Sequence, residues 1–332
     1  MLMKNYQMMF LLFLTMGILI AVSSNSWFLC WLGLEINLMS MIPLIIIKLN
    51  STFTEAAIKY FLTQAMASLI MIISSMLENS LFNMFLMQES SLMILLALSI
   101  KSGLAPFHYW FPQVMLLMKW FQCSIILTIQ KIAPFMLMSF LPCNKMIFFI
   151  VMMSAMVGSL GGLNQLIMKT ILTFSSIAHS SWMLLLIFYS MNSWMFYFII
   201  YSMIILTMIF LINFINLSTL SEMNNSKMSN INKLIFIVNI LSLGGLPPFM
   251  GFLAKLNAIF VFMFKISTFV MLILITASLV SLFYYLKISY FIIMSNNQET
   301  NISMKYNSLI MKILFTMTMT GNIFTPIMVS LT

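Results

Sequence analysis

Long apolar stretches follow one another along almost the whole chain, and each has about the length of a bilayer-spanning helix. Hydrophobic residues make up 62% of the 332 positions and charged residues only 6%, whereas a soluble domain carries about 25% charged residues. A chain of this composition cannot cover a globular surface with polar groups. We therefore expect an all-α polytopic membrane protein without a separate soluble domain.

The hydrophobic windows give eleven candidate transmembrane helices within one domain that spans residues 1–332. The windows lie at 6–24, 27–47, 59–77, 91–111, 122–141, 146–163, 170–190, 193–214, 233–262, 267–293 and 307–331. No small-residue cleavage site follows the first window, so it is interpreted as a helix and not as a signal peptide. The ninth window is too long for one straight crossing, and we expect it to be broken at Gly244-Gly245-Leu246-Pro247-Pro248.

The lysines outside the apolar windows fall mainly on one side of the predicted membrane. Ten are expected on the side of the N-terminus and only two, Lys145 and Lys265, on the other side. Because connections rich in Lys stay in the negative compartment, the N-terminus is predicted to face that compartment and the C-terminus the opposite one. The net charge of +9 is attributed to this topology, so no nucleic-acid partner is expected.

A short motif occurs twice, in the fourth and ninth windows. The copies, 142 residues apart, read Gly103-Leu104-Ala105-Pro106-Phe107 and Gly245-Leu246-Pro247-Pro248-Phe249. The two windows cross the membrane in opposite directions, which indicates an inverted repeat with a broken helix in each half, near 101–112 and 244–255. Pro removes a backbone donor, and the carbonyl groups that are freed need water or polar partners, so each break is expected beside a cavity.

Four charged residues lie deep inside apolar windows: Glu35, Lys101, Lys131 and Lys255. A lysine at the centre of a bilayer costs about 2.5–3.5 kcal/mol, and such residues commonly face a wet interior and handle ions. These four residues are therefore the candidate proton-transfer groups. The alternative is structural, either a lysine that snorkels to the interface or a carboxyl group hydrogen-bonded within the bundle. Snorkelling fits Lys131 poorly, because this residue lies near the middle of its window.

His108 and His179 are the two histidines of the chain, and both are candidate relays because histidine titrates near neutral pH. The alternative is a polar side chain that satisfies backbone groups at a break or a helix contact. No dinucleotide fingerprint, phosphate-binding loop, haem ligand pair or cysteine cluster is present in the sequence. We expect this chain to bind no redox cofactor and no metal. The remaining acidic residues are expected in connections between helices: Glu55, Glu78, Glu89, Glu222 and Glu299.

Seven segments resemble a known family, in order along the chain. They read GLEINLMSMIPL (33–44), EAAIKYFLTQAMAS (55–68), KSGLAPFHYWFP (101–112), QKIAP (130–134), GGLNQ (161–165), SSIAHSSW (175–182) and LSLGGLPPFMGFLAKL (241–256). Together they are similar to the NADH dehydrogenase subunit 2 family of animal mitochondria, which are antiporter-like membrane subunits of respiratory complex I. The resemblance runs from about residue 28 to residue 290, and the last part of the chain matches only as a hydrophobic span.

The resemblance implies a fold of eleven helices in the mitochondrial inner membrane, with the N-terminus in the matrix and the C-terminus on the intermembrane side. It implies other membrane-arm subunits and phospholipids such as cardiolipin as partners, while NADH, FMN, iron–sulfur clusters and ubiquinone are expected elsewhere in the complex. The family's central carboxylate and lysines map onto Glu35, Lys101, Lys131 and Lys255. The implied function is proton translocation to the intermembrane space, driven by quinone reduction in neighbouring subunits.

One position departs from the family pattern. After KSGLAPFHYWFP the family usually has an acidic residue, whereas this chain has Gln113, which puts a role for a carboxylate at that loop in doubt. Two other functions are weighed against a proton-translocating subunit: a stand-alone cation/proton antiporter of the same fold, and a scaffold with inactive charges. An antiporter would exchange sodium for protons in vesicles by itself, whereas a subunit would co-purify with NADH oxidation.

Overall fold

The protein is described by a computed structural model over residues 5–48, 50–79, 84–215, 217–220, 222, 230–247, 249–263 and 265–294. Within these ranges the regular structure is helical, apart from one isolated pairing between Ile167 and Thr219, which confirms the predicted all-α class. Eight helical segments in the same ranges have the length and apolar composition to cross a membrane. The predicted window 307–331, Glu299 and Pro248 lie outside the described residues.

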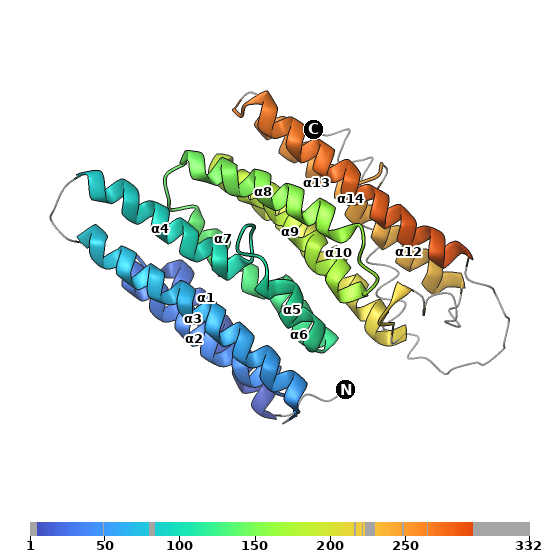
Figure 1. Ribbon diagram of the computed structural model, residues 1–332, viewed down its shortest axis with the longest axis horizontal. Helices are drawn as coiled ribbons and strands as arrows, with labels where there is room; N and C mark the ends of the chain where they lie inside the picture. Colours follow the sequence, from blue (N-terminus) through green and yellow to red (C-terminus); the bar gives the residue numbers. More distant parts are fainter. Residues whose placement is uncertain are drawn as a thin grey trace. The chain divides into compact units, whose positions relative to one another are not determined.

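The chain folds into two compact units, divided between Ser154 and Ala155. The first unit contains α1 (Asn5–Ser23), α2 (Trp27–Ile45), α3 (Ser51–Asn79), α4 (Met84–Ser102), α5 (Trp110–Leu117), α6 (Trp120–Leu127) and α7 (Ile129–Met138), which Figure 1 labels. The helix α8 (Lys145–Gly162) contains the division. The second unit contains α9 (Met168–Tyr189), α10 (Met191–Ile215), α12 (Asn230–Gly244), α13 (Met250–Phe262) and α14 (Thr268–Met294).

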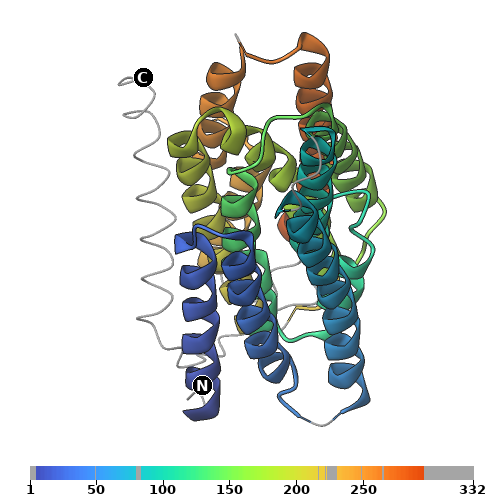
Figure 2. The ribbon, with the colours of Figure 1, turned by 90° about the vertical axis from the view of Figure 1, so that its left-hand side faces the viewer.

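The helices α1 and α2 are antiparallel neighbours joined by a short connection, as Figure 2 shows. Their backbones approach closely at two glycines. A Cβ atom on Gly17 would lie 2.9 Å from the backbone nitrogen of Asn37, and one on Gly33 would lie 2.6 Å from the backbone nitrogen of Ala21. Small residues permit this close approach between transmembrane helices. The contact fixes α2, which carries Glu35, against α1.

Two helices end at the glycine of the repeated motif, with the same backbone pattern. Gly103 (φ 72°) follows α4 and Gly245 (φ 77°) follows α12. In both, the amide of the glycine donates to the carbonyl oxygen three residues earlier: Gly103 to Ile100, and Gly245 to Ser242. The amide of the next residue donates to the carbonyl oxygen five residues earlier: Leu104 to Ser99, and Leu246 to Leu241. This is the Schellman motif, in which a left-handed glycine ends a helix. The next helices begin only at Trp110 and Met250.

The third helix is longer than its predicted window, because polar residues extend it. The helix α3 begins at Ser51, so that Glu55 and Glu78 lie within it and not in connections, and Glu89 lies within α4. Glu55 and Lys59 form an ion pair of 2.7 Å one turn apart, an arrangement that stabilises helices. The prediction that placed these glutamates in connections was therefore wrong, whereas Glu222 does lie between α10 and α12.

The predicted window 122–141 contains two helices, not one. The helix α6 ends at Leu127 and α7 begins at Ile129. Thr128 between them has φ −118° and ψ −77°, and its hydroxyl donates to the Ser124 carbonyl oxygen at 2.7 Å. A Thr side chain that bonds the carbonyl oxygen four residues back often bends a helix. This interruption lies directly before the segment that carries Lys131.

Candidate functional site

Lys101 and Lys131 line one small cavity in the first unit. Their side chains are buried, with exposed fractions of 7% and 2%. The cavity has a volume of about 10 Å³, which is room for about one water molecule. Its walls come from Tyr60, Lys101, Ser102, Trp110, Phe111, Ile126, Gln130 and Lys131. The two lysines that the sequence singled out are therefore brought together at one cavity.

Lys101 lies in the last turn of α4, where side chains from other elements cap the helix. The indole Nε1 of Trp110 donates to the Ile100 carbonyl oxygen at 3.1 Å, and Gln64 Nε2 donates to the carbonyl oxygen of Lys101 at 3.5 Å. These two donors add to the backbone amides of Gly103 and Leu104, which also donate to carbonyl oxygens at this helix end. Lys101 itself lines the cavity.

Glu35 is coupled electrostatically to Lys101. It is half-buried on α2 in the same unit, and its carboxylate attracts the Lys101 ammonium. Charges inside a protein interact more strongly than charges in water, because the surroundings have a lower dielectric constant. The charge of Glu35 therefore acts on the Lys101 ammonium.

Lys131 stands near the start of α7, with its ammonium 5.8 Å from the centroid of the Phe111 ring. This distance permits a cation–π interaction. The residue before it, Gln130, exchanges two hydrogen bonds with Asn37 of α2. Asn37 Nδ2 donates to Gln130 Oε1 at 3.0 Å, and Gln130 Nε2 donates to Asn37 Oδ1 at 2.8 Å. Apart from their closeness to Lys131 and Glu35, these amides have no feature in the sequence that singles them out.

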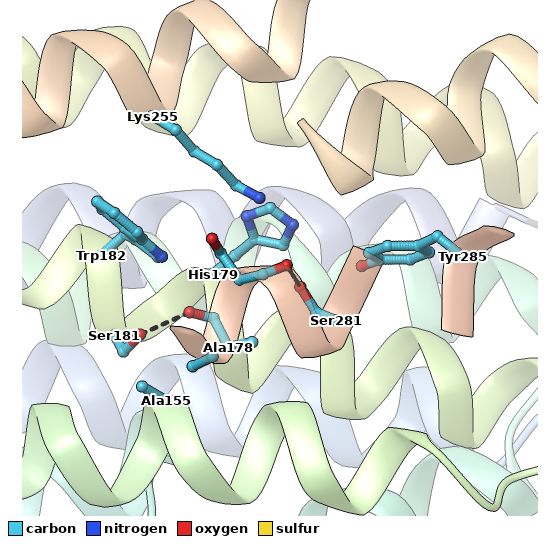
Figure 3. A pocket seen from close by; sticks show the side chains of 10 residues that line it. Ala155, Ala178, His179, Ser181, Trp182, Lys255, Ser281 and Tyr285 are labelled. Carbon is cyan, nitrogen blue, oxygen red and sulfur yellow. Dashed lines mark hydrogen bonds between the residues drawn. The ribbon is translucent and has the colours of Figure 1, made fainter. Parts of the chain in front are cut away.

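Lys255 and His179 line a second cavity, which lies in the second unit and also has a volume of about 10 Å³. Both side chains are buried. In Figure 3, Lys255 extends from α13 toward the imidazole of His179 on α9, and Ser281 and Tyr285 of α14 border the same space. The rest of the wall is made mainly of small side chains: Ala155, Ala178, Ser181, Trp182, Ala277 and Ser278.

The Lys255 ammonium also caps the helix that precedes it. Lys255 Nζ donates to the Gly244 carbonyl oxygen at 2.8 Å. A Cβ atom on Gly245 would lie 2.9 Å from both the Cδ and the Nζ of Lys255, so a side chain at this position would displace the Lys255 ammonium from this contact. Lys255 therefore has two roles in the structure. Its ammonium is a hydrogen-bond partner for a backbone carbonyl group at a helix end, and the residue also lines a cavity.

His179 has a buried tyrosine as its partner. Its Nδ1 lies at a hydrogen-bonding distance of 2.8 Å from the hydroxyl oxygen of Tyr197. The ring of Tyr201, one turn further along α10, lies 5.4 Å from the imidazole between centroids. Tyr197 was not predicted from the sequence, because a tyrosine in an apolar helix has the same signature as a packing residue.

His108 lies apart from both cavities. It stands between α4 and α5, where its Nδ1 donates to the carbonyl oxygen of Pro106 at 3.3 Å and its ring stacks on Tyr109 at 4.5 Å. It is not among the residues that line the cavities of Lys101 or Lys255. In the part of the chain that the structure describes, no group of three or more His, Cys, Asp or Glu side chains is arranged to hold a metal ion.

The chain matches a family model described as NADH:quinone oxidoreductase/Mrp antiporter, transmembrane, over residues 24–283. Proteins named NADH-ubiquinone oxidoreductase chain 2 are similar over most of their length. The one from Anopheles gambiae is 41% identical over 303 residues, which cover 90% of this chain and 89% of the relative. The one from Locusta migratoria is 38% identical over 315 residues, which cover 92% of each.

Solved structures share the fold. A chain of respiratory complex I from Thermus thermophilus superposes with a TM-score of 0.86 at 23% identity, covering 97% of this chain and 78% of that one. A chain of an Mrp complex from Dietzia gives a TM-score of 0.80 at 16% identity, covering 95% of this chain and 74% of that one. At these identities the similarity concerns the fold alone.

Proposed function

The chain belongs to the NADH:quinone oxidoreductase/Mrp antiporter family, and we propose that it works as a proton-translocating membrane subunit of mitochondrial NADH:ubiquinone oxidoreductase. It is one subunit of the hetero-oligomeric complex I and a multi-pass protein of the inner membrane. The similarity to chain 2 of this oxidoreductase extends over 90% of the chain. This extent favours a subunit of the complex over a stand-alone antiporter.

The observation that supports proton transfer through this chain is the burial of Lys101 and Lys131 beside one water-sized cavity. Two buried ammonium groups are costly in an apolar protein. A position at a cavity gives each of them access to a hydrogen-bonding path, and the nearby Glu35 gives a means of control.

In the proposed mechanism, Lys101 is the central proton site and Glu35 controls it. When Lys101 is charged, the Glu35 carboxylate stabilises the ammonium, and removal of this attraction favours release of the proton. Lys131 receives the proton next, and Lys255 serves the exit side or the next subunit. His179 acts as a relay beside Lys255, and His108 as a relay near the end of α4. The step is driven by quinone reduction in neighbouring subunits.

The proposed membrane arrangement has eleven transmembrane helices in a single domain, residues 1–332. This arrangement contains an inverted repeat with two broken helices, near residues 101–112 and 244–255. The identical Schellman endings at Gly103 and Gly245 support this repeat. The uneven distribution of the lysines supports an N-terminus in the matrix and a C-terminus on the intermembrane side.

We propose that this chain binds no cofactor itself, and that NADH, FMN, iron–sulfur clusters and ubiquinone are bound elsewhere in the complex. Its expected neighbours are other membrane-arm subunits and phospholipids such as cardiolipin, and no nucleic acid. Large apolar side chains on the outer surface support a lipid contact, among them Phe269 and Phe283 of α14, which are each 64% exposed.

The experiment that tests the function is Lys101→Met in the intact complex, reconstituted into vesicles. The rate of proton translocation per assembled complex should fall, while the amount of assembled complex stays unchanged, because Met keeps the length of the side chain without the charge. Lys48→Met, at an exposed lysine, is the matched control. A wild-type translocation rate in Lys101→Met would contradict the proposed function.

A further inference from the structure

We propose that Asn37 and Gln130 are positioning residues, which together hold the helix of Glu35 in register with the helix of Lys131. We call this pair the amide clasp. The inference rests on the proposed function, because it concerns how the proton-carrying groups keep their separations. It assigns a role to two uncharged residues that carry no proton themselves.

The clasp is a closed pair of hydrogen bonds. Asn37 donates to Gln130 at 3.0 Å and Gln130 donates to Asn37 at 2.8 Å, so each amide uses both a donor and an acceptor on the other. The two residues lie 93 positions apart in the chain. Asn37 is buried, with an exposed fraction of 3%. Reciprocal bonds fix both the distance and the orientation of the two side chains.

The clasp residues lie close in sequence to Glu35 and Lys131, on the same two helices. Asn37 follows Glu35 by two residues on α2, which is about 3 Å along the helix axis. Gln130 directly precedes Lys131 on α7 and lines the same cavity as Lys101 and Lys131. A shift of α7 against α2 would therefore move Lys131 relative to Glu35 and would also change the cavity wall.

Backbone packing alone does not account for this link. The main neighbours of α7 are α1, α4 and α6, and those of α2 are α1 and α3. The side-chain amides thus bridge two helices that are not each other's main neighbours. Because α1 packs on both α2 and α7, the clasp adds a direct side-chain link between two helices that α1 already brings near each other.

An amide pair suits this task because it does not titrate. Attraction between Glu35 and the lysines strengthens and weakens as protons move, since each transfer changes a charge. The Asn37–Gln130 hydrogen bonds join neutral groups and remain the same in every charge state. A displacement of about 1 Å at a reacting group can lower the rate up to about 100-fold. A link that keeps the same distances in every charge state therefore maintains the rate of proton transfer.

A purely structural role is the competing explanation, and Gln122 provides the matched control. Gln122 also ties an element to α2, since its Nε2 donates to the carbonyl oxygens of Leu44 and Ile45 at the end of that helix. Gln122 is not among the residues that line the Lys101 cavity. Gln122→Ala should reduce the amount of assembled complex and leave the translocation rate per assembled complex unchanged.

The test exchanges the two amides in the intact complex. Asn37→Gln makes the clasp one methylene too long and Gln130→Asn makes it one too short, whereas the double variant restores the total length. Each single variant should lower the rate of proton translocation per assembled complex at least several-fold, and the double variant should recover most of the loss. All rates are divided by the amount of assembled complex, so that a loss of folding is not mistaken for a loss of positioning.

Two results overturn the inference: single variants that translocate at the wild-type rate, or a double variant no better than the single ones. The variant Lys101→Met distinguishes a wrong inference about the clasp from a wrong proposed function. If Lys101→Met slows translocation while the amide variants do not, the clasp is wrong and the proposed function stands. If Lys101→Met has no effect, the function itself fails.

Discussion

The Lys255 ammonium donates a hydrogen bond of 2.8 Å to the Gly244 carbonyl oxygen, from α13 back to the end of α12. The corresponding end of α4 is closed by the same backbone motif but is capped by Trp110 and Gln64. The two glycine-closed helix ends thus use their lysines differently. Lys255 both binds a helix end and lines a cavity, whereas Lys101 lines its cavity and interacts with the charge of Glu35.

Replacing Lys255 by Met should loosen the end of α12. A hydrogen bond from a charged group to a buried carbonyl contributes about 1.5–3 kcal/mol, and Met cannot form it. Amide hydrogen exchange at Gly245 and Leu246 should become faster, and proton translocation per assembled complex should fall. Lys265→Met, at an exposed lysine, should change neither quantity. Unchanged exchange in Lys255→Met would show that the hydrogen bond does not hold this helix end.

Adjacent glycines at the end of α12 should respond very differently to alanine. Gly245 has a φ of 77°, which costs about 1–2 kcal/mol for a residue with a side chain, and its Cβ would lie 2.9 Å from Lys255. A Cβ on Gly244 would find its nearest atom, on Tyr285, at an ordinary 3.5 Å. Gly245→Ala should therefore reduce the assembled complex on a native gel, and Gly244→Ala should not. Equal yields would refute this distinction.

Removing the Tyr197 hydroxyl should impair His179 as a relay. Tyr197→Phe keeps the ring but deletes the hydrogen bond of 2.8 Å to the imidazole, so the ring of His179 loses the partner that orients it. We expect a lower translocation rate per assembled complex. The control is Tyr201→Phe, which removes a hydroxyl near Ser176 and keeps a ring beside the same imidazole. The same rate in both variants would argue against an orienting role for Tyr197.

The connection after α10 should lose an anchor at acidic pH, namely the hydrogen bonds that the Glu222 carboxylate accepts. Ser218 donates to the Glu222 carboxylate through its backbone amide and its hydroxyl, both at 2.7 Å, and the Thr219 amide donates at 3.3 Å. The backbone amide of Ser218 is the largest cause that lowers the pKa of Glu222 below its usual 4.5. Because the folded state favours the ionised carboxylate, the anchor is fully present above about pH 4.5 and is lost as pH falls below this value.

Amide hydrogen exchange measures this loss. Protection of the Ser218 and Thr219 amides should be constant at neutral pH and should decrease from pH 4.5 toward pH 3. In Glu222→Gln the protection should be weaker and should not depend on pH in this range, since the amide does not titrate. Protection in the unmodified protein that persists unchanged to pH 3 would exclude the carboxylate as the anchor.

Helix positions were predictable from local composition. The predicted window 170–190 corresponds to α9 at Met168–Tyr189, and 146–163 corresponds to α8 at Lys145–Gly162. These elements depend on apolar side chains close together in the sequence, which a window detects. The start of α3 at Ser51 and the interruption at Thr128 were not predicted, because polar residues occupy both places and a hydropathy window does not detect helix ends among polar residues.

The candidate site was predictable only in its charged members and in His179. Lys101, Lys131 and Lys255 stand out because a charge is rare in an apolar helix, and all three are buried. Tyr197, Asn37 and Gln130 have no such contrast with their neighbours in the sequence. His108 was singled out by its residue type, and it lines neither of the two cavities, so its role as a relay stays a prediction.

The sequence by itself determined that this chain is helical, that it belongs in a membrane, and which charged residues stand within its apolar stretches. Lipid offers no hydrogen bonds, so the backbone must satisfy itself within each segment, and this makes the outcome local. Only the tertiary structure decided which polar groups meet. Asn37 reaches Gln130 across 93 positions, and Lys255 reaches Gly244 across a helix end, because helix packing, which no local stretch encodes, sets those distances.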